Sequence, residues 1–365
     1  MSPKPFVWLF AALGAAWVSA QSAQPLAGGS GTLYIGAWPN RIFVIDEATE
    51  QVSGTITMQV AGTAPGALRL SKDRKRFYVL NTNLEDLEVV DIAGRKSVDR
   101  FRLSEGRRRV RLVDLVPDPL DRYVIVMAKI SEKREDHFAI APNALLVYDL
   151  ASHRVTRTIP WPDGDEQEGV GLVFSPDGKF LFVLAEDVQV LETTNFTKVD
   201  TWELSRPIES GFGRLDLGGN EQDYDEPEVA TLFVRVSDAI QQRPLFGIAR
   251  VNLTARSVDF FTLGPAVGRS RFAFALAPDG SHAYGLLQEI GRYEFWSFDL
   301  AGRRVTSRTE FAGRPRMSLH VSSNGKLLYV YGAGNTIDLH EAATYRYLRT
   351  ITLDGDTTSP LRVLR

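Results

Sequence analysis

The chain has 365 residues, of which 44% are hydrophobic and 24% charged, and its 42 Lys and Arg residues nearly balance 45 Asp and Glu residues. This is the composition of an ordinary globular protein, and the balanced charge excludes the basic footprint of nucleic-acid binding and any strong attraction to an anionic membrane. The absence of cysteine excludes disulfides, thiolate zinc sites, covalent c-type haem, a cysteine nucleophile and a cysteine-derived quinone within this chain.

Residues 1–20 have the pattern of a secretory signal peptide. Lys4 supplies the positive start, Phe6 to Val18 form a short apolar run, and a small-residue cleavage site ends at Ala20. The run is too short to span a bilayer comfortably, although a retained anchor is the alternative. We therefore expect a periplasmic or extracellular protein that begins near Gln21, has a flexible segment over residues 21–30 and has no membrane span after signal removal.

From residue 31 onward, short runs rich in β-branched and aromatic residues alternate with turn formers. The pattern is clearest from Pro65 to Leu103, where four such runs follow one another. Four consecutive antiparallel strands form one blade of a β-propeller.

A repeat marker, an apolar-x-acid step that closes the third strand of each unit, recurs along the chain. It ends at Asp46, Asp91, Asp149, Glu192, Asn252, Asp299 and Glu341, with Asn once in place of the acid. The markers lie 42 to 60 residues apart, which is the scale of propeller blades. We therefore predict that residues 31–365 form a single all-β domain, a seven-bladed β-propeller of four-stranded antiparallel blades.

The turn between the first and second strands is a second marker in register with the first. It reads Ser175-Pro176-Asp177-Gly178 and has counterparts at 277–280 and 322–325. Pro fixes φ at the second position and Asp-Gly closes the turn, so the motif indicates turn chemistry and not catalysis.

The two ends of the domain are predicted to share a blade. Blade one begins with only three strands, at 32–37, 41–46 and 52–58, while Ser359 to Arg365 repeats the Pro-x-x-apolar start of Pro65 to Leu68. The C-terminal strand would therefore enter blade one, close the ring and remove the open sheet edges.

Blade two and the turn at 175 carry a family resemblance. Tyr78-Val79-Leu80-Asn81, followed by Leu87 to Asp91, together with Ser175 to Lys179, resembles the exported YVTN-type β-propeller repeat over nearly the whole mature chain. That family is similar to the propeller subunits of quinoprotein amine dehydrogenases, where the propeller scaffolds a separate cofactor-bearing chain, and to propeller lactonases. The resemblance implies the fold and leaves these functions as alternatives.

Three insertions interrupt the repeat. Ser131 to Asn143 and Ser237 to Pro244 separate the second and third strands of blades three and five, so both are expected on the face that carries the blade-to-blade connections. Asn220 to Glu228 is expected on the opposite face. It is rich in oxygen ligands but lacks the spacing of a calcium loop, so we predict a solvated acidic hairpin.

Polar residues of the innermost strands are predicted to face the axis. They are Arg69, Asp114, Asp216 and His320. One interpretation is a site for a charged ligand or ion. The other, which we favour, is that these residues pair with one another or with water, because an isolated buried charge is costly. Acid–base catalysis by Asp114 or Asp216 with His320 is conceivable, but we assign no catalytic residue, metal ligand or cofactor.

Arginines gather in the blade-to-blade connections, with Arg109, Arg271 and Arg316 as candidate anchors because each opens or immediately precedes an innermost strand. Such arginines suit carboxylates, phosphates or an acidic protein patch, although a solvated face with internal ion pairs is the alternative. We therefore predict a non-catalytic binding or scaffold propeller whose partner is a protein or a small anionic ligand. The alternative is a lactonase-like hydrolase or the cofactor-free subunit of a quinoprotein amine dehydrogenase.

Overall fold

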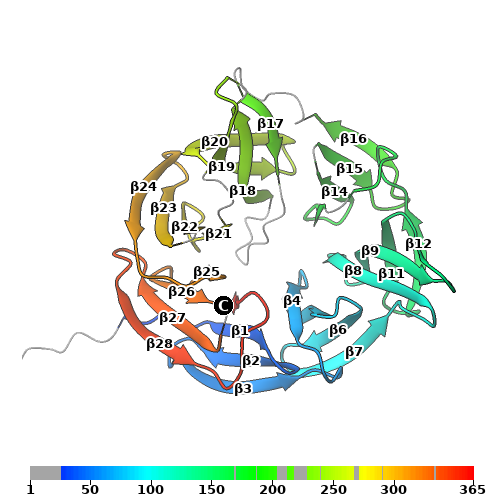
Figure 1. Ribbon diagram of the computed structural model, residues 1–365, viewed down its shortest axis with the longest axis horizontal. Coiled ribbons are helices and arrows are strands. Elements are labelled where there is room, and N and C mark those ends of the chain that lie inside the picture. The colour runs from blue at the N-terminus through cyan, green and yellow to red at the C-terminus, as the bar shows by residue number, and fades with distance from the viewer. Residues whose placement is uncertain are drawn as a thin grey trace, which may run out of the picture.

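Seven antiparallel sheets stand around a central axis (Figure 1). The computed structural model describes residues 26–167, 170–185, 187–203, 212–217, 228–238, 240–266, 271–289, 291–332 and 334–365, and of residues 212–216 it describes the backbone alone. Within these residues there are strands and turns and no helix. The predicted seven-bladed, all-β propeller is therefore confirmed.

The first four blades follow the chain from blade one, whose innermost strand comes from the C-terminus. Blade one contains β29 (Arg362–Leu364), β1 (Thr32–Ala37), β2 (Arg41–Asp46) and β3 (Gln51–Thr57). Blade two contains β4 (Pro65–Leu70), β5 (Arg76–Asn81), β6 (Asp86–Asp91) and β7 (Lys96–Arg102). Blade three contains β8 (Arg108–Pro117), β9 (Tyr123–Lys133), β10 (Phe138–Ile140), β11 (Ala144–Asp149) and β12 (Arg154–Ile159). Blade four contains β13 (Gly171–Phe174), β14 (Phe180–Leu184), β15 (Val188–Glu192) and β16 (Lys198–Trp202).

The remaining three blades have the simple four-strand order. Blade five contains β17 (Phe212–Asp216), β18 (Val229–Asp238), β19 (Arg243–Asn252) and β20 (Ser257–Pro265). Blade six contains β21 (Arg271–Leu276), β22 (His282–Glu289), β23 (Arg292–Asp299) and β24 (Arg304–Glu310). Blade seven contains β25 (Ser318–Val321), β26 (Leu327–Tyr331), β27 (Thr336–Glu341) and β28 (Tyr347–Thr352).

The C-terminal strand closes the ring as predicted. β29 pairs with β1 in antiparallel register, with Leu33 opposite Val363 and Tyr34 opposite Arg362. Leu361 and Val363 are fully buried in the cluster shared by blades one and seven. Closure therefore joins the two ends of the domain through both backbone pairing and apolar burial.

The apolar core lies between neighbouring blades. Among the described residues, each of the seven interfaces holds one buried cluster. This follows from strand periodicity, because alternate side chains of a strand face opposite neighbours. In β5, for example, Phe77 and Val79 pack toward blade one, and Tyr78 and Leu80 toward blade three.

The repeat marker marks the same backbone geometry in every blade. The residue four positions after the marker has a left-handed φ between 50° and 60°, at Glu50, Arg95, His153, Phe196, Arg256, Arg303 and Tyr345. The marker side chain caps the turn, as when Asp149 Oδ1 accepts hydrogen bonds from Ser152 N and Oγ, both 2.7 Å away. The acid was therefore correctly interpreted as the end of the third strand.

These left-handed residues also join the blades at the outer rim, since each contacts the outermost strand of the preceding blade. The seven contacts are Arg95 Nη1 to Ser53 O (2.9 Å), His153 Nδ1 to Asp99 Oδ2 (3.5 Å), the Arg157 guanidinium over the Phe196 ring (5.8 Å), Arg256 to Asp200 (2.8 Å), Arg303 to Asp259 (2.5 Å), Tyr345 to Ser307 (2.7 Å) and Arg349 Nε to Glu50 Oε2 (2.6 Å). An exposed ion pair contributes at most about 1 kcal/mol. The three Arg–carboxylate pairs among the rim contacts therefore add little stability each.

The Ser-Pro-Asp-Gly turn is held by its own side chains. Asp177 Oδ1 accepts hydrogen bonds from Ser175 Oγ (2.6 Å) and Lys179 N (3.1 Å), and Ser175 Oγ accepts one from Phe180 N (2.9 Å). Gly178 has φ 70°, a conformation that favours glycine. Ser322 and Asn324 form the same arrangement in blade seven. The turn interpretation is confirmed.

This geometry predicts an acid sensitivity that can be moved by substitution. The turn hydrogen bonds lower the pKa of Asp177 from 3.8 to about 2. The ionised Asp177 therefore stabilises the fold fully above pH 3.8, and this stabilisation is lost as the pH falls from 3.8 to about 2. Asn keeps the acceptor oxygen without titrating. We therefore expect D177N to lose less melting temperature than wild type between about pH 6 and pH 2.5, and N324D to lose more. Equal losses in all three proteins, measured by circular dichroism, would contradict this.

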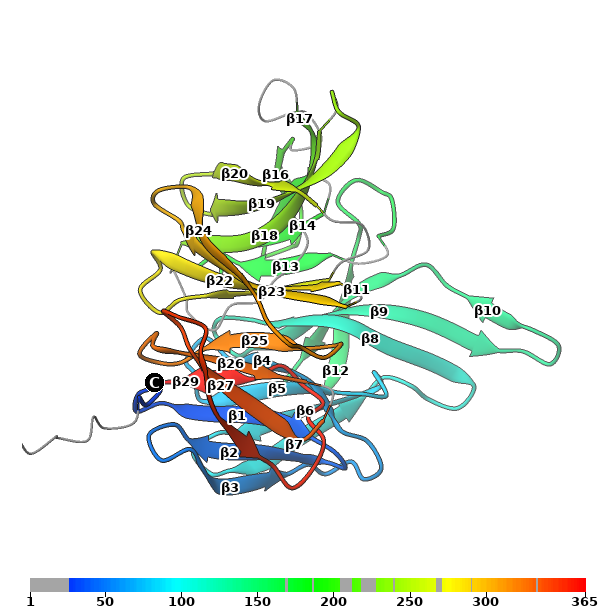
Figure 2. The same ribbon diagram turned by 60° about the vertical axis from the view of Figure 1, so that its left-hand side comes forward.

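The blade-three insertion is a hairpin that extends the sheet beyond the ring. β9 continues past the blade and turns into β10, while the first residues of β8 pair with the same extension, with Arg108 opposite Glu132. Figure 2 shows this three-stranded projection leaving one face of the propeller. The second-to-third-strand insertion of blade five ends in a shorter hairpin, with Asp238 opposite Arg243.

Candidate binding face

One face of the propeller carries both the blade-to-blade connections and the second-to-third-strand loops. We call it the connector face and the opposite one the turn face. Strand pairing defines it, because the start of each innermost strand lies opposite the end of the second strand, as at Arg271 with Gln288 and Ser318 with Tyr331. The insertions of blades three and five therefore reach the connector face, as predicted.

Two of the polar residues predicted to face the axis pair with each other. Arg69 Nη2 lies 2.7 Å from Asp114 Oδ1 across blades two and three, and both side chains are about one quarter exposed. Asp114 Oδ1 also accepts a hydrogen bond from Leu115 N at 2.8 Å. For this pair, the interpretation that axial charges satisfy one another is confirmed.

His320 is buried at the start of blade seven. Its residue is 8% exposed, and its Nδ1 lies 2.8 Å from the carbonyl oxygen of Val321, to which a protonated Nδ1 donates. The neighbouring Leu319 and Val321 pack into the core between blades six and seven. The side chain of Asp216 lies outside the described atoms, so the hypothesis that it acts with His320 stays a prediction.

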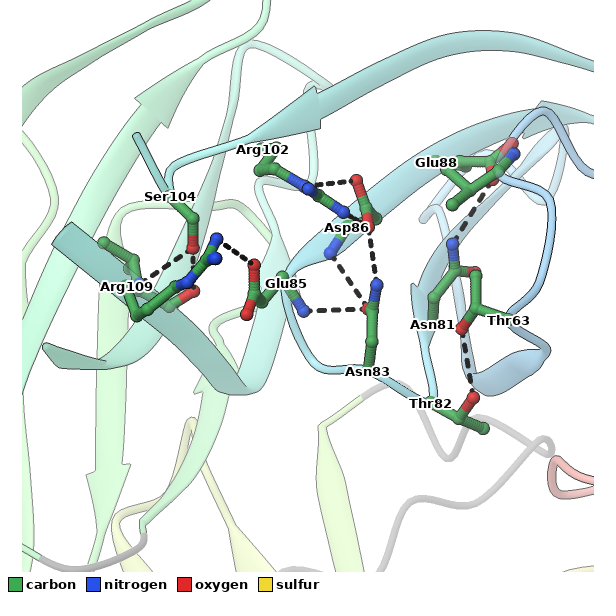
Figure 3. A network of polar contacts seen from close by, with 12 residues as sticks. Thr63, Asn81, Thr82, Asn83, Glu85, Asp86, Glu88, Arg102, Ser104 and Arg109 are labelled. Atoms are coloured by element: carbon green, nitrogen blue, oxygen red, sulfur yellow. Dashed lines mark hydrogen bonds and ion pairs between the residues drawn. The ribbon is translucent and has the colours of Figure 1, made fainter. Parts of the chain in front are cut away.

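Arg109 takes part in a polar network on the connector face (Figure 3). Its Nη1 lies 3.6 Å from Glu85 Oε2, in the second-to-third-strand loop of blade two. Two further hydrogen bonds hold the same loop. Asn83 Oδ1 accepts one from Glu85 N at 3.0 Å, and Asp86 Oδ1 accepts one from Arg102 Nε at 2.9 Å. The Arg109 side chain remains 56% exposed, so it can contact a partner while it holds this loop.

Arg316 is exposed and is positioned by the residue that follows it. The following residue, Met317, exchanges two hydrogen bonds with the buried amide of Gln288: Met317 N to Oε1 (2.8 Å) and Nε2 to Met317 O (2.7 Å). Gly332 permits this path, because a Cβ there would lie 2.6 Å from Arg316 O. Blade six therefore positions Arg316 at the entrance to β25.

The exposed Arg271 opens β21, and neither it nor Arg316 makes an ion pair with a described residue. Arg314, by contrast, donates to Thr336 Oγ1 at 2.8 Å and lies 3.7 Å from Asp338. Four further charged residues of the blade-to-blade connections lie outside the described residues, namely Glu168, Arg206, Glu209 and Arg269. Nearly all of the acidic segment Asn220 to Glu228 lies outside them as well. The arginines of the blade-to-blade connections are therefore of two kinds. Arg109 and Arg314 contact neighbouring side chains, whereas Arg271 and Arg316 are exposed and make no ion pair with a described residue.

Sequence reasoning missed a set of exposed apolar side chains on the same face. Trp38, Phe138, Ile140 and Ile240 are 51%, 62%, 75% and 79% exposed, and all lie in second-to-third-strand loops or their hairpins. Leu120, in the turn between β8 and β9, is the corresponding residue on the turn face and is 65% exposed. The signal was present in the sequence as large apolar residues within otherwise polar loops, and apolar side chains that gather on one surface mark interaction sites.

Metal and membrane features can be stated for the described part of the chain. It holds no group of three or more His, Cys, Asp or Glu side chains that could bind a metal ion. None of its segments forms a helix long and apolar enough to cross a membrane.

Solved structures resemble this chain over nearly its whole length. A functionally unknown protein from Desulfotomaculum acetoxidans has a TM-score of 0.56 and 12% identity, with 92% of this chain and 99% of that chain covered. Apo AztD from Citrobacter koseri gives 0.53 and 14%, with 92% and 98% covered. The periplasmic gluconolactonase PpgL from Pseudomonas aeruginosa gives 0.53 and 16%, with 92% and 99% covered.

These neighbours are β-propeller proteins with varied roles. At such identities the likeness shows the fold alone. No protein-family model and no curated protein sequence matches the chain.

Proposed function

We propose that this protein is an exported, non-catalytic binding or scaffold propeller of the periplasm or extracellular space, and that its connector face binds a protein or a small anionic ligand. The single observation that carries the proposal is the coincidence, on that face, of exposed apolar loop residues with exposed arginines. Among the large apolar side chains of the described residues, those more than 60% exposed are Phe138, Ile140 and Ile240 on the connector face and Leu120 on the turn face.

The arrangement suits recognition for physical reasons. Binding energy in protein interfaces comes mainly from a few aromatic, aliphatic and arginine side chains. In this protein such side chains lie on loops of a rigid ring, so binding a partner costs little conformational entropy. The signal sequence at residues 1–20 supports export, and Tyr78 to Asn81 on β5 supports membership of the YVTN-type repeat family.

The test starts from protein purified from the periplasm of an expression host, in which the mature chain should begin near Gln21. Co-purified proteins and a panel of carboxylates and phosphates are then measured for binding. We expect the combined change of Arg109, Arg271 and Arg316 to Ala to weaken the binder more than tenfold, or by about 1.4 kcal/mol or more. Arg346→Ala, a 67%-exposed arginine on the turn face, is the matched control.

The proposal fails if R346A weakens binding as much as the triple variant does. A different pair of results would support the enzymatic alternative: turnover of a sugar lactone by the purified protein, or co-purification of a small quinone-bearing subunit. Loss of binding on change of residues 220–228 alone would move the site to the opposite face.

A further inference from the structure

The hairpin of β9 and β10 projects beyond the edge of the ring (Figure 2). It carries two large, exposed apolar side chains. Phe138 is 62% exposed and Ile140 is 75% exposed. They are two residues apart in the same short strand, so they lie on one face of it. Keeping an aromatic and a branched aliphatic side chain in water forgoes about 1.5–3 kcal/mol of burial for each.

Strand register places cations beside them. Phe138 lies directly opposite Lys133 and Ile140 opposite Ser131, while on the other side of β9 Arg109 lies opposite Ser131 and Arg111 opposite Lys129. Directly opposed residues share a face of an antiparallel sheet, as do alternate residues of one strand. We call this set the hairpin patch, and its members are Arg109, Arg111, Lys129, Ser131, Lys133, Phe138 and Ile140.

Glu85 approaches this face, 3.6 Å from Arg109, whereas two other carboxylates of the region are directed elsewhere. Glu132 alternates to the other face of β9 and pairs with Arg134 at 3.0 Å. Glu166, in the connection to blade four, accepts a hydrogen bond from Asn143 N at 2.6 Å. Within the part of the chain that the structure describes, Arg111 and Lys133 make no ion pair. The hairpin patch therefore combines apolar area with positive charge.

The base of the hairpin is fixed to the next connection. Trp161 Nε1 donates to Asn143 O at 2.8 Å, and Asn143 Nδ2 donates to Gln167 O at 2.9 Å. These bonds tie the return strand to the ring just beyond Ile140. The patch is thus held on an anchored sheet rather than on a loose loop, which lowers the entropy lost when a partner binds.

We propose that the hairpin patch docks an acidic protein segment that places an apolar side chain between its carboxylates. The inference rests on the proposed function and names the chemistry of the partner. The apolar side chain covers Phe138 and Ile140, while the carboxylates pair with Arg111 and Lys133. Apolar contact supplies affinity, and charge complementarity supplies orientation and speed of association.

The geometry favours a protein over an anionic membrane. The tip of the hairpin consists of Arg134, Glu135, Asp136 and His137, and the apolar residues lie on its flank. A hairpin that inserts into lipid needs its apolar residues at the tip, because entering tip first would carry two acids into the anionic interface. A protein surface can approach the flank without touching the tip.

The test is selection from a random peptide library displayed on phage, with the full-length protein as bait. Recovered peptides should carry a net negative charge and at least one aromatic or large aliphatic residue. Their affinity, measured by fluorescence anisotropy with synthetic copies, should fall more than tenfold for F138S/I140S and for K133E. The matched controls, L120S and K326E on the turn face, should leave it unchanged.

The remaining outcomes overturn the docking proposal. They are recovery of no acidic-apolar peptide, equal binding by F138S/I140S, flotation with phosphatidylglycerol vesicles that F138S/I140S abolishes, or a dimer in analytical ultracentrifugation that this variant dissociates. Peptides that lose affinity for R271A/R316A but not for F138S/I140S would refute this inference while the proposed function stands. Unchanged melting temperatures show that each variant is folded.

Discussion

Removing residues 359–365 is expected to destabilise the whole ring. Leu361 and Val363 are fully buried between blades one and seven, and burial of such side chains contributes about 1.5–3 kcal/mol each. The segment also donates Leu361 N to Tyr331 Oη at 2.9 Å and Arg362 Nε to Leu68 O at 2.9 Å. With about 1 kcal/mol for each hydrogen bond, the loss approaches the 5–15 kcal/mol that holds a typical domain together.

The measurement is thermal unfolding of the shortened chain, together with its oligomeric state. We expect a drop of more than 10 °C or aggregation, because β1 would expose an open edge. A synthetic peptide of residues 357–365 should restore much of the loss, since it can pair with β1. L361A and V363A should give intermediate losses. If the shortened protein is monomeric and melts like the full chain, closure does not support the fold.

The fold was predictable because its signals are local. The acids at Asp46, Asp91 and Asp149 end strands by capping turns, and turn chemistry depends on neighbouring residues alone. The rim contacts were not predictable, because every blade has the left-handed position but the residue type that occupies it varies. Arg95 donates to a backbone carbonyl, whereas the ring of Phe196 lies under a guanidinium group. Backbone position recurs in every blade, but residue type does not.

The candidate site was predictable only in outline. Strand parity placed the connections and insertions on one face, because it follows from strand order alone. Side-chain partners did not follow, since Arg109 meets Glu85 across two blades and this contact depends on the shape of both loops. The pairing of Arg69 with Asp114 was expected because a charge that is partly withdrawn from water is stabilised by an opposite charge.

Substitution of Glu47 is expected to cause a large loss of stability. It is fully buried, and its carboxylate accepts hydrogen bonds at 2.8 Å each from Gly31 N, Ser323 N and Tyr329 Oη, in addition to one from Ser323 Oγ. These donors belong to the segment before β1 and to blade seven. One carboxylate therefore joins the start of the domain to its last full blade, beside the closure made by β29.

Glu47→Ala would leave two buried donors, Gly31 N and Tyr329 Oη, and the part-buried Ser323 without an acceptor. Each buried donor costs about 1–3 kcal/mol, so we expect a loss of about 2–6 kcal/mol in the free energy of unfolding. Glu47→Gln should lose less but still destabilise, because its amide nitrogen would face a donor. Denaturant titration measures both, with Glu135→Ala, an exposed glutamate of the hairpin tip, as the control expected to change little. Limited proteolysis should cut E47A before β1 sooner than wild type, because Gly28 O receives Asn324 N and Ser323 Oγ from the same group of residues. An unfolding midpoint for E47A equal to that of E135A would show that water replaces the carboxylate without loss, and that blade pairing alone holds the ring closed.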